Sequence, residues 1–324
     1  MIMSVLLFAV GLVLLIKGGD WFVDAATGIA KRFNLPDIVV GATVVSIGTT
    51  LPEVMVSTTG ALAGSGAMAY GNAIGSIICN TALIAAISIT CNPGPVNVKS
   101  MKTPAIFFFG AAAMYCLAAY GLGTFPRWMG FIMLTVFVVY MVLTVRNGMK
   151  NPDSVEEEEE EDSKPKALWQ ELLLLVIGAA VIAVGADLLV EHGQIIAIGL
   201  GVPETVVALL FVALGTSLPE LVTTITSLKK GRASLGVGNV IGANVFNLVL
   251  VSGVAVSLAP FDVPCENLLL DTGLNLSLVF DIPVMLGVMS LMIFPAMATK
   301  KLGRWQGIAL LCIYAAFCVC QFVL

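Results

Sequence analysis

The sequence predicts an all-α polytopic membrane protein with ten transmembrane helices, arranged as two inverted-topology five-helix repeats. Three observations predict it: an apolar composition, a series of long apolar windows, and an internal repeat. The chain has 324 residues, of which 58% are hydrophobic and only 11% are charged. A soluble domain usually has about 25% charged residues. The composition therefore excludes an ordinary soluble domain.

Apolar windows follow one another along almost the whole chain. A helix of about 20 apolar residues is long enough to cross the hydrocarbon core of a bilayer. Windows of this length predict spans at residues 3–23, 36–63, 67–91, 104–121, 127–146, 168–191, 203–228, 233–258, 279–298 and 304–323. Asp281 and Pro283 interrupt the ninth span. The first charge is Lys17, so the first span lacks the basic start of a secretory signal and is expected to remain as a helix.

The two halves of the chain repeat each other at a constant offset of 167 residues. The segment "GTTLPE", which ends at Glu53, returns as "GTSLPE", which ends at Glu220. Five spans precede an acidic segment and five follow it. We therefore divide the chain into a first repeat at 1–147, a cytoplasmic linker at 148–167 and a second repeat at 168–324, with the repeated motifs at 36–91 and 203–258. The acidic run Glu156–Asp162 in the linker is interpreted as a solvated segment.

The basic residues predict the orientation. Almost all of them lie in alternate connections: Lys31, Arg32, Lys99, Lys102, Arg146, Lys150, Lys164, Lys166, Lys229, Lys230, Arg232, Lys300, Lys301 and Arg304. Basic connections usually face the cytoplasm, so both termini are expected outside the cell. An odd number of spans in each half inverts the second half relative to the first. Inverted repeats are typical of secondary transporters, whose site lies near the bilayer midplane between the halves.

Each of the two glutamates directly follows a proline inside an apolar span. Pro52 and Pro219 lack an N–H, so each should break its helix and release backbone carbonyls, near Ser46 to Thr49 and near Ala213 to Thr216. An intramembrane carboxylate is costly and by default functional. No lysine or arginine lies in the middle of a span to neutralise these two. Their partner is therefore expected to be a metal ion or a proton.

Hydroxyl and amide side chains accompany the glutamates. Thr49 and Thr50 precede Glu53 by four and three residues, and Thr216 and Ser217 precede Glu220 in the same way, so these oxygens fall on or near one helix face. The next span of each half carries a polar stripe with four-residue spacing, Asn72, Ser76 and Asn80 in the first and Asn239, Ala243 and Asn247 in the second. Hydrogen bonding between helices is the simpler interpretation for any single one of these side chains. Glycines beside the stripes should let helices approach closely: Gly71, Gly75, Gly238 and Gly242.

All of these donors are oxygens. Carboxylates, hydroxyls, amide oxygens and carbonyls suit a hard cation such as Ca²⁺, which takes about six to eight oxygens. Softer metals are disfavoured because the only histidine, His192, lies at a span end and Cys79 stands alone. The seven cysteines show no metal-ligand or disulfide spacing. No cofactor is expected.

These residues resemble a known family. The segments "GTTLPE" and "GTSLPE", followed by "GNAIGSIICN" and "GNVIGANVFN", closely resemble the two α-repeats of the Ca²⁺/cation antiporter superfamily, in the prokaryotic part of its Na⁺/Ca²⁺ exchanger branch. The similarity covers nearly the whole chain in span count and linker position. The H⁺/Ca²⁺ branch typically follows its Gly-Asn with a glutamate motif, which this sequence lacks.

The resemblance implies a mechanism and a set of ligands. Spans 2, 3, 7 and 8 would form a four-helix core, across which spans 1 and 6 slide to alternate access. Glu53 and Glu220 would bind Ca²⁺, with help from Thr49 and Thr216. Na⁺ would share those acids. The other residues implied, as further Na⁺ ligands or as the lining of the central site, are Thr50, Ser217, Ser76, the carbonyls of Ser46 and Ala213, Asn80 and Asn247.

Two positions depart from the family pattern. Asn247 stands where some relatives, including K⁺-dependent ones, carry Asp, which argues against K⁺ co-transport. Ala243 stands where relatives often carry Ser, which removes a candidate hydroxyl and leaves the number of Na⁺ ions open.

The sequence thus predicts an antiporter of the plasma membrane, not an enzyme, that exchanges Ca²⁺ for Na⁺ by alternating access. Its partners would be the two ions and membrane lipid, with no nucleic acid, and the oligomeric state is left open. Exchange of Ca²⁺ or another divalent cation for H⁺ is the alternative, because two protons could neutralise the same acids. A passive cation channel, and an intramembrane hydrolase with the two acids as a dyad, are more remote alternatives.

Overall fold

The protein is a mostly helical, multi-pass membrane protein. The computed structural model describes residues 2–150, 167–200, 215–264 and 275–323. Within these ranges eight helices are long and apolar enough to span a bilayer, or nine if the bent pair Asp37–Thr49 and Leu51–Leu62 is one span. Part of the predicted span 203–228 and most of the linker lie outside the described residues. The count of ten therefore stays a prediction.

Helices dominate both halves, with π-helical segments denoted η. The first half contains α1 (Ile2–Phe33), α2 (Asp37–Val40), η1 (Gly41–Val45), α3 (Ser46–Thr49), α4 (Leu51–Leu62), α5 (Gly66–Cys79), η2 (Asn80–Ala85), α6 (Ala86–Cys91), β1 (Gly94–Pro95), α7 (Val98–Cys116), η3 (Leu117–Leu122), β2 (Thr124–Phe125) and α8 (Arg127–Lys150). The second half contains α9 (Leu168–Gly199), α11 (Leu218–Lys229), α12 (Ala233–Phe246), η4 (Asn247–Val251), α13 (Ser252–Leu258), β3 (Phe261–Asp262), η6 (Ser277–Asp281), α14 (Ile282–Thr299), β4 (Lys301–Leu302) and α15 (Arg304–Val323).

The repeat in the sequence is also a repeat of local structure. Helices α4 and α11 begin and end at the same offset of 167 residues, and so do α5 and α12. The π-helices η2 and η4 begin at the equivalent residues Asn80 and Asn247. The short strands connect the halves, because β1 pairs antiparallel with β4 and β2 pairs antiparallel with β3. Each strand pair therefore joins one half of the chain to the other.

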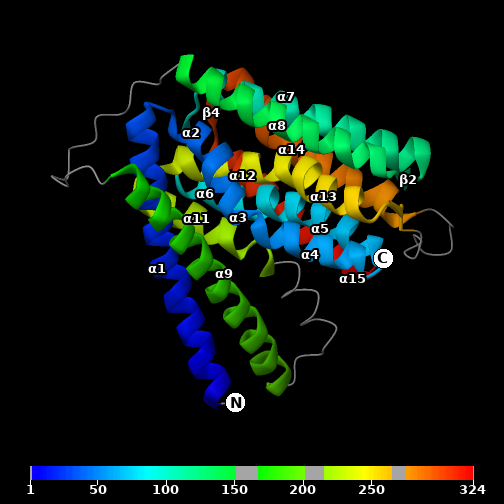
Figure 1. Ribbon diagram of the computed structural model, residues 1–324, viewed down its shortest axis with the longest axis horizontal. Helices are drawn as coiled ribbons and strands as arrows, with labels where there is room; N and C mark the ends of the chain where they lie inside the picture. Colours follow the sequence, from blue (N-terminus) through cyan, green and yellow to red (C-terminus); the bar gives the residue numbers. More distant parts are fainter. Residues whose placement is uncertain (1, 151–166, 201–214, 265–274, 324) are drawn as a thin grey trace.

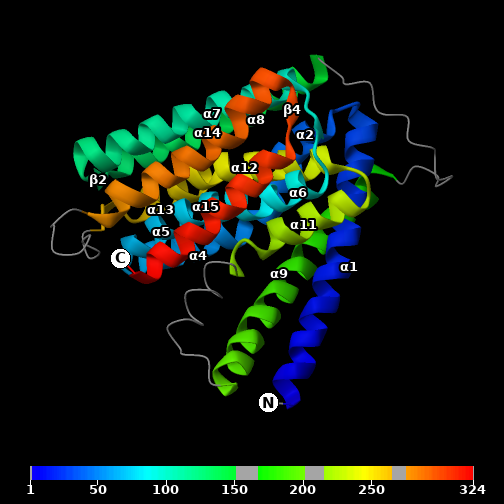
Figure 2. The ribbon, with the colours of Figure 1, turned by 180° about the vertical axis from the view of Figure 1, so that it is seen from behind.

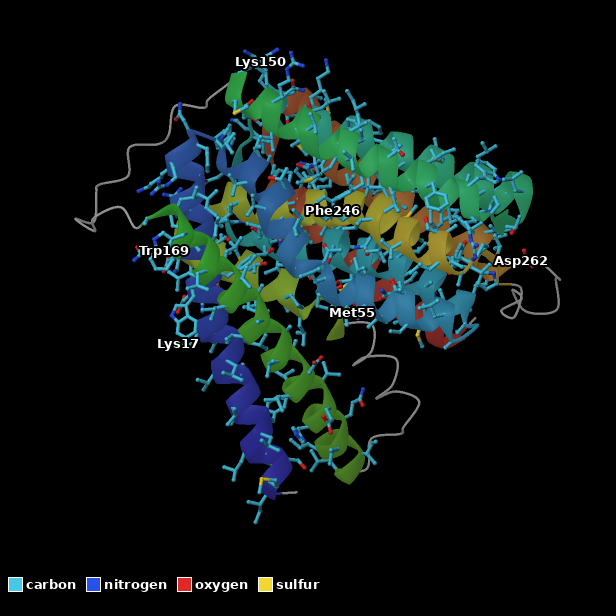
Figure 3. The ribbon with its side chains drawn as sticks, in the orientation of Figure 1. Lys17, Met55, Lys150, Trp169, Phe246 and Asp262 are labelled. Carbon is cyan, nitrogen blue, oxygen red and sulfur yellow. The ribbon has the colours of Figure 1, made fainter. Side chains whose placement is uncertain are left out.

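The core is built around the span formed by α12, η4 and α13. In the apolar window of this span 83% of the residues are buried, and in the window of α5, η2 and α6 the share is 72%. Figure 1 shows α12 and α13 running through the middle of the bundle, with α7 and α8 along one side. Phe246, labelled in Figure 3, is fully buried and packs against Phe137 and Tyr140 of α8 at ring-centroid distances of 5.0 and 6.0 Å. The most enclosed helices are thus those that carry the polar stripes.

Helices α1 and α9 form an antiparallel pair that leans away from this core, as Figures 1 and 2 show. Only 28% and 22% of their apolar windows are buried. The two backbones meet at glycines: a Cβ on Gly11 would lie 2.8 Å from the carbonyl oxygen of Gly185, and a Cβ on Gly185 would lie 2.9 Å from that of Gly11. Gly18 and Gly178 make similarly close contacts across the pair. Small residues permit this approach in a membrane, so few side chains interlock at these points.

The broken helix predicted at Pro52 is present. Helix α3 ends at Thr49, Thr50 has ψ −3°, and α4 resumes at Leu51 with a bend of 46°. Pro52 stands in the first turn of α4, where its missing N–H costs no helical hydrogen bond. Ser217 repeats the feature before α11, with ψ 4°. Each break ends one helix and begins another directly before a glutamate.

Candidate cation site

The two glutamates are fully buried, each in the first turn of the helix that follows a break, α4 for Glu53 and α11 for Glu220. Thr50, at the break directly before α4, contacts Glu220, so the segments that carry the two glutamates meet. Both carboxylate oxygens of Glu53, and Oε2 of Glu220, have no hydrogen-bond partner in the described part of the chain. Oε1 of Glu220 accepts a long hydrogen bond from Thr50 Oγ1, at 3.5 Å.

No basic side chain in the described ranges forms an ion pair with these carboxylates. The ion pairs among the described residues all involve Arg32, Lys230 or Arg232, which belong to the basic connections. The first-turn positions give each carboxylate the positive end of a helix dipole. That effect is modest beside the cost of burying two like charges. The arrangement therefore favours a bound cation.

Two hydrogen bonds link the halves directly beside the glutamates. Thr49 Oγ1 donates to Asn239 Oδ1 at 3.1 Å, and Thr216 Oγ1 donates to Asn72 Oδ1 at 3.3 Å. These bonds are equivalent under the repeat, since Thr49 corresponds to Thr216 and Asn72 to Asn239. Because each hydroxyl donates its hydrogen to an amide oxygen, its own lone pairs stay free for a cation.

The two asparagines also hold the surrounding side chains. Asn239 Nδ2 donates to Thr223 Oγ1 at 3.0 Å. Asn72 Nδ2 donates to Ser57 Oγ at 2.8 Å and to the backbone carbonyl of Glu53 at 3.3 Å. The sequence placed both asparagines in the polar stripes but not among the site residues. The sequence shows the spacing of these asparagines, but their role in orienting other side chains depends on partners in the opposite half.

Asn80 and Asn247 supply further unpartnered polar atoms. Both side chains are fully buried, and neither the amide nitrogen nor the amide oxygen of either has a partner among the residues that the structure describes. Each is the first residue of a π-helix, a local structure frequent at functional sites. One turn earlier on α5, Ser76 is buried, whereas the equivalent position on α12 is Ala243, which has no hydroxyl.

The remaining predicted residues fall into three groups. Thr50 and Ser217 are buried at the two helix breaks. Ser46 is buried, and its carbonyl accepts a hydrogen bond from the Thr50 amide at 3.0 Å, so its role as a carbonyl ligand stays a prediction. Ala213 lies outside the described residues. In addition the Sγ of Cys79 accepts a hydrogen bond from Tyr314 Oη at 3.8 Å.

Chemically, the described donors are two carboxylates, hydroxyls and amide oxygens. Oxygen ligands of this kind select hard cations such as Ca²⁺ and Na⁺. No cluster of three or more His, Cys, Asp or Glu side chains suited to a metal ion occurs in the described ranges. The candidate site thus consists of two carboxylates supplemented by neutral oxygens.

Comparison with known proteins identifies the family. The family model described as "Sodium/calcium exchanger protein" matches residues 3–146 and 171–323, which is most of the chain. The chain belongs to the sodium/calcium exchanger family. This places it in the Ca²⁺/cation antiporter superfamily, whose relatives found here are transporters rather than enzymes.

Individual relatives extend over the full length of this exchanger-family chain. It is 34% identical over 314 residues to an uncharacterized membrane protein of Methanocaldococcus jannaschii, which covers 97% of this chain and 96% of that protein. It is 28% identical to the sodium/calcium exchanger MaX1 of Methanosarcina acetivorans, with 98% of each chain covered. A solved structure of the sodium-calcium exchanger NCX_Mj, soaked with 10 mM Na⁺ and no Ca²⁺, matches with a TM-score of 0.77, 32% identity and 97% coverage of both chains.

Proposed function

We propose that this protein exchanges Ca²⁺ for Na⁺ across the plasma membrane at a midplane site built on Glu53 and Glu220. The observation that carries the proposal is the pair of fully buried carboxylates without a basic partner in the described chain. Two negative charges match one Ca²⁺. Na⁺ would bind the same carboxylate oxygens, so the two ions exclude each other.

The surrounding oxygens complete the proposed site. Thr49 and Thr216 would assist Ca²⁺, because their hydroxyls are fixed by donation to Asn239 and Asn72. Thr50, Ser217, Ser76 and the carbonyls of Ser46 and Ala213 would serve Na⁺, and Asn80 and Asn247 would line the centre. The unpartnered amides of the last two support this, since a bound ion or its water would satisfy them.

Alternating access would arise between two inverted five-helix repeats with ten spans in total. Helices α1 and α9 are the proposed moving pair. Their low burial and glycine-lined contact support movement relative to a core that is joined by strand pairs and hydrogen bonds. The empty site, with two unpaired charges, would cross poorly, and this couples the two ions. No cofactor is needed for such a cycle.

The proposed orientation places both termini outside and the linker in the cytoplasm. The proposal rests on the position of the basic residues in alternate connections, because such connections usually face the cytoplasm. The ion-paired residues Arg32, Lys230 and Arg232 all lie at helix ends in these connections.

The test is uptake of radioactive Ca²⁺ into proteoliposomes with a single counter-ion gradient. Vesicles loaded with Na⁺ and diluted into Na⁺-free buffer should accumulate Ca²⁺, whereas vesicles loaded with K⁺ should not. A protein carrying both Glu53→Gln and Glu220→Gln serves as the control for leakage. Uptake driven by a pH gradient alone would replace Na⁺ with H⁺ as the counter-ion, and uptake that needs no counter-ion would indicate a channel.

A further inference from the structure

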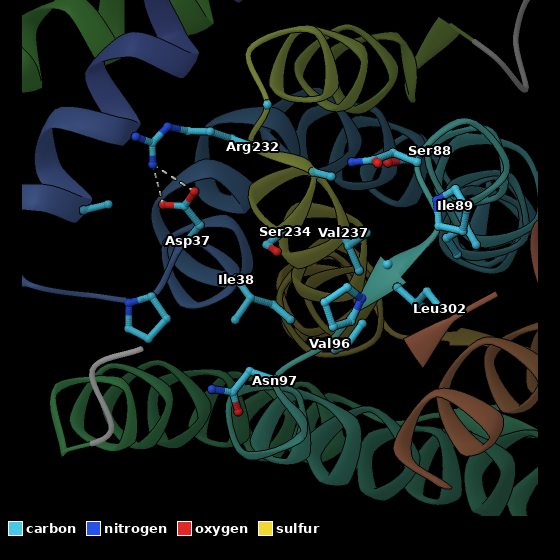
Figure 4. A pocket seen from close by; sticks show the side chains of 18 of the residues that line it. Asp37, Ile38, Ser88, Ile89, Val96, Asn97, Arg232, Ser234, Val237 and Leu302 are labelled. Carbon is cyan, nitrogen blue, oxygen red and sulfur yellow. Dashed lines mark hydrogen bonds and ion pairs between the residues drawn. The ribbon is translucent and has the colours of Figure 1, made fainter. Parts of the chain in front are cut away.

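A second site lies at the end of the molecule that carries the basic connections, which is the proposed cytoplasmic face. A cavity of about 540 Å³ opens there between the two halves. Its walls come from the end of α1, the start of α2, the end of α6, the loop that contains β1, and the turn between α11 and α12, as Figure 4 shows. Small-molecule sites commonly have volumes of about 300 to 1,000 Å³.

The repeat allows the cavity to be compared with the equivalent place on the opposite face. Gly94 and Val237, which line the cavity, correspond at the offset of 167 to Phe261 and Tyr70. Those two side chains pack on Phe125 at ring-centroid distances of 5.3 and 5.9 Å. The difference lies in the residue types, so it persists in whichever conformation the protein adopts.

The polar lining is also confined to that face. Ser88 and Asn92 of the cavity correspond to Ala255 and Ala259, which pack in a small apolar cluster with Phe261. Ser88 is only 2% exposed, lines the cavity, and donates no hydrogen bond to any other residue that the structure describes. Its place in the wall, visible in Figure 4, leaves the hydroxyl available to water or to a ligand in the cavity.

The cavity carries a net positive charge. Lys31 and Arg232 line it together with one carboxylate, Asp37. Arg232 Nη1 contacts Asp37 Oδ1 and Oδ2 at 3.1 and 3.0 Å across the two halves, which leaves the other N–H groups of the guanidinium for a ligand. Helix α12 begins in the wall at Ala233 without a side-chain cap, so the positive end of its dipole adds to the positive potential.

We infer that this cavity binds a small phosphate-bearing anion. The guanidinium, the Lys31 ammonium and the uncapped start of α12 would hold the phosphate, and the Ser88 hydroxyl and Asn92 amide would add hydrogen bonds. Ile38 and Val237 in the lining give the cavity an apolar side for the non-phosphate part of the molecule. The source of the phosphate is either a free cytoplasmic compound or the headgroup of an anionic phospholipid, since basic pockets between membrane helices take both.

The test is a binding measurement on the full chain, purified in potassium chloride. Equilibrium dialysis against radioactive orthophosphate should show one saturable site, with sulfate competing and chloride at equal ionic strength not competing. Arg232→Gln should weaken binding by about tenfold or more, as the loss of one charge-assisted contact does. Lys31→Gln and Ser88→Ala should also weaken it, and they keep the test informative if Arg232→Gln, which breaks the contact with Asp37, fails to fold.

Lys229→Gln is the matched control, because Lys229 is exposed in the same turn, carries the same charge and does not line the cavity. A parallel arm uses vesicles of phosphatidylcholine with and without phosphatidylglycerol, followed by extraction and native mass spectrometry of retained lipid. If the cavity variants lose orthophosphate binding and Lys229→Gln keeps it, the ligand is a free compound. If the cavity variants lose retained phosphatidylglycerol and Lys229→Gln keeps it, the ligand is a lipid. Neither ligand bound, or equal losses in Lys229→Gln, overturns the proposal.

Discussion

Asn72 and Asn239 occupy equivalent positions in the two halves, yet their surroundings differ. Asn239 is fully buried and accepts hydrogen bonds from both Ser46 and Thr49 on its side-chain oxygen, at 3.3 and 3.1 Å. Asn72 is only half-buried, and among the described residues its side-chain oxygen accepts from Thr216; Ala213, the equivalent of Ser46, has no hydroxyl to donate. The repeat therefore places matching residues in matching positions, but the packing around them decides how firmly each is held.

Glycines beside Asn239 show how closely α12 approaches the first half. A Cβ on Gly238 would lie 2.3 Å from the carbonyl oxygen of Ile38, and one on Gly242 would lie 2.3 Å from Ser46 Oγ, so α12 rests directly on the broken span. The close approach expected at these two glycines is confirmed. The same expectation at Gly71 and Gly75 stays a prediction, because the equivalent segment, residues 205–213, lies outside the described residues.

The glutamates are where the halves are most alike, so their neutralisation should have the largest and most equal effects. Glu53→Gln and Glu220→Gln should each abolish Ca²⁺ transport, because a divalent ion would keep only half of its formal counter-charge in a low-dielectric site. Radioactive Ca²⁺ flux in proteoliposomes measures this, with protein yield and monodispersity as the folding control. Near-normal flux in one of the two variants would remove that acid from the site.

The contact at Gly238 predicts the next largest effect. Gly238→Ala should sharply lower the yield of folded protein and its thermal unfolding midpoint, because the new Cβ meets backbone atoms that cannot move aside. Gly110→Ala on the exposed side of α7 is the control and should be tolerated, because a Cβ there meets no atom within 4 Å in the described structure. Melting curves of both purified variants decide it, and equal stability would contradict the tight contact at Gly238.

Substitution of the two asparagines should have smaller, unequal effects. Asn239→Ala would remove the amide nitrogen that donates to Thr223 Oγ1 and the amide oxygen that accepts from Thr49 Oγ1. Each buried group left unsatisfied costs about 1 to 3 kcal/mol. Asn72→Ala removes a partner from the less buried Thr216. We expect the former to lower the Ca²⁺ transport rate more than the latter. The reverse order of initial rates would contradict the firmer hold on Asn239.

The smallest effect is expected from adding the hydroxyl that α12 lacks at position 243. Ala243→Ser makes the second stripe match Asn72, Ser76 and Asn80, and should raise Na⁺ occupancy and the dependence of exchange on voltage. A third Na⁺ would carry one net charge, which is worth about 2.3 kcal/mol per 100 mV. Na⁺-dependent Ca²⁺ flux with the potential set by K⁺ and valinomycin compares the variant with the wild type. An identical voltage response in both would exclude position 243 from the Na⁺ site.

Much of the fold followed from local sequence rules. The membrane helices and the helix breaks at Pro52 and Pro219 were predictable, because a run of apolar residues or a missing N–H acts on its own segment. The family was predictable from the repeated motifs. The bonds from Thr49 to Asn239 and from Thr216 to Asn72 were not, because each needs a partner from the opposite half. The cavity beside Arg232 was hidden for the same reason: it forms where segments distant in the sequence converge.

The strand pairs and the threonine–asparagine bonds share one geometric property. β1 of the first half meets β4 of the second, and β2 of the first meets β3 of the second, while Thr49 meets Asn239 and Thr216 meets Asn72. When residue i of one unit contacts residue j of the other and the reverse contact also occurs, the interface is isologous, as in a twofold-symmetric homodimer. The chain therefore contains, within one polypeptide, the contacts that two copies of a single half would make with each other. Duplication of a gene that encoded one such half accounts for this interface.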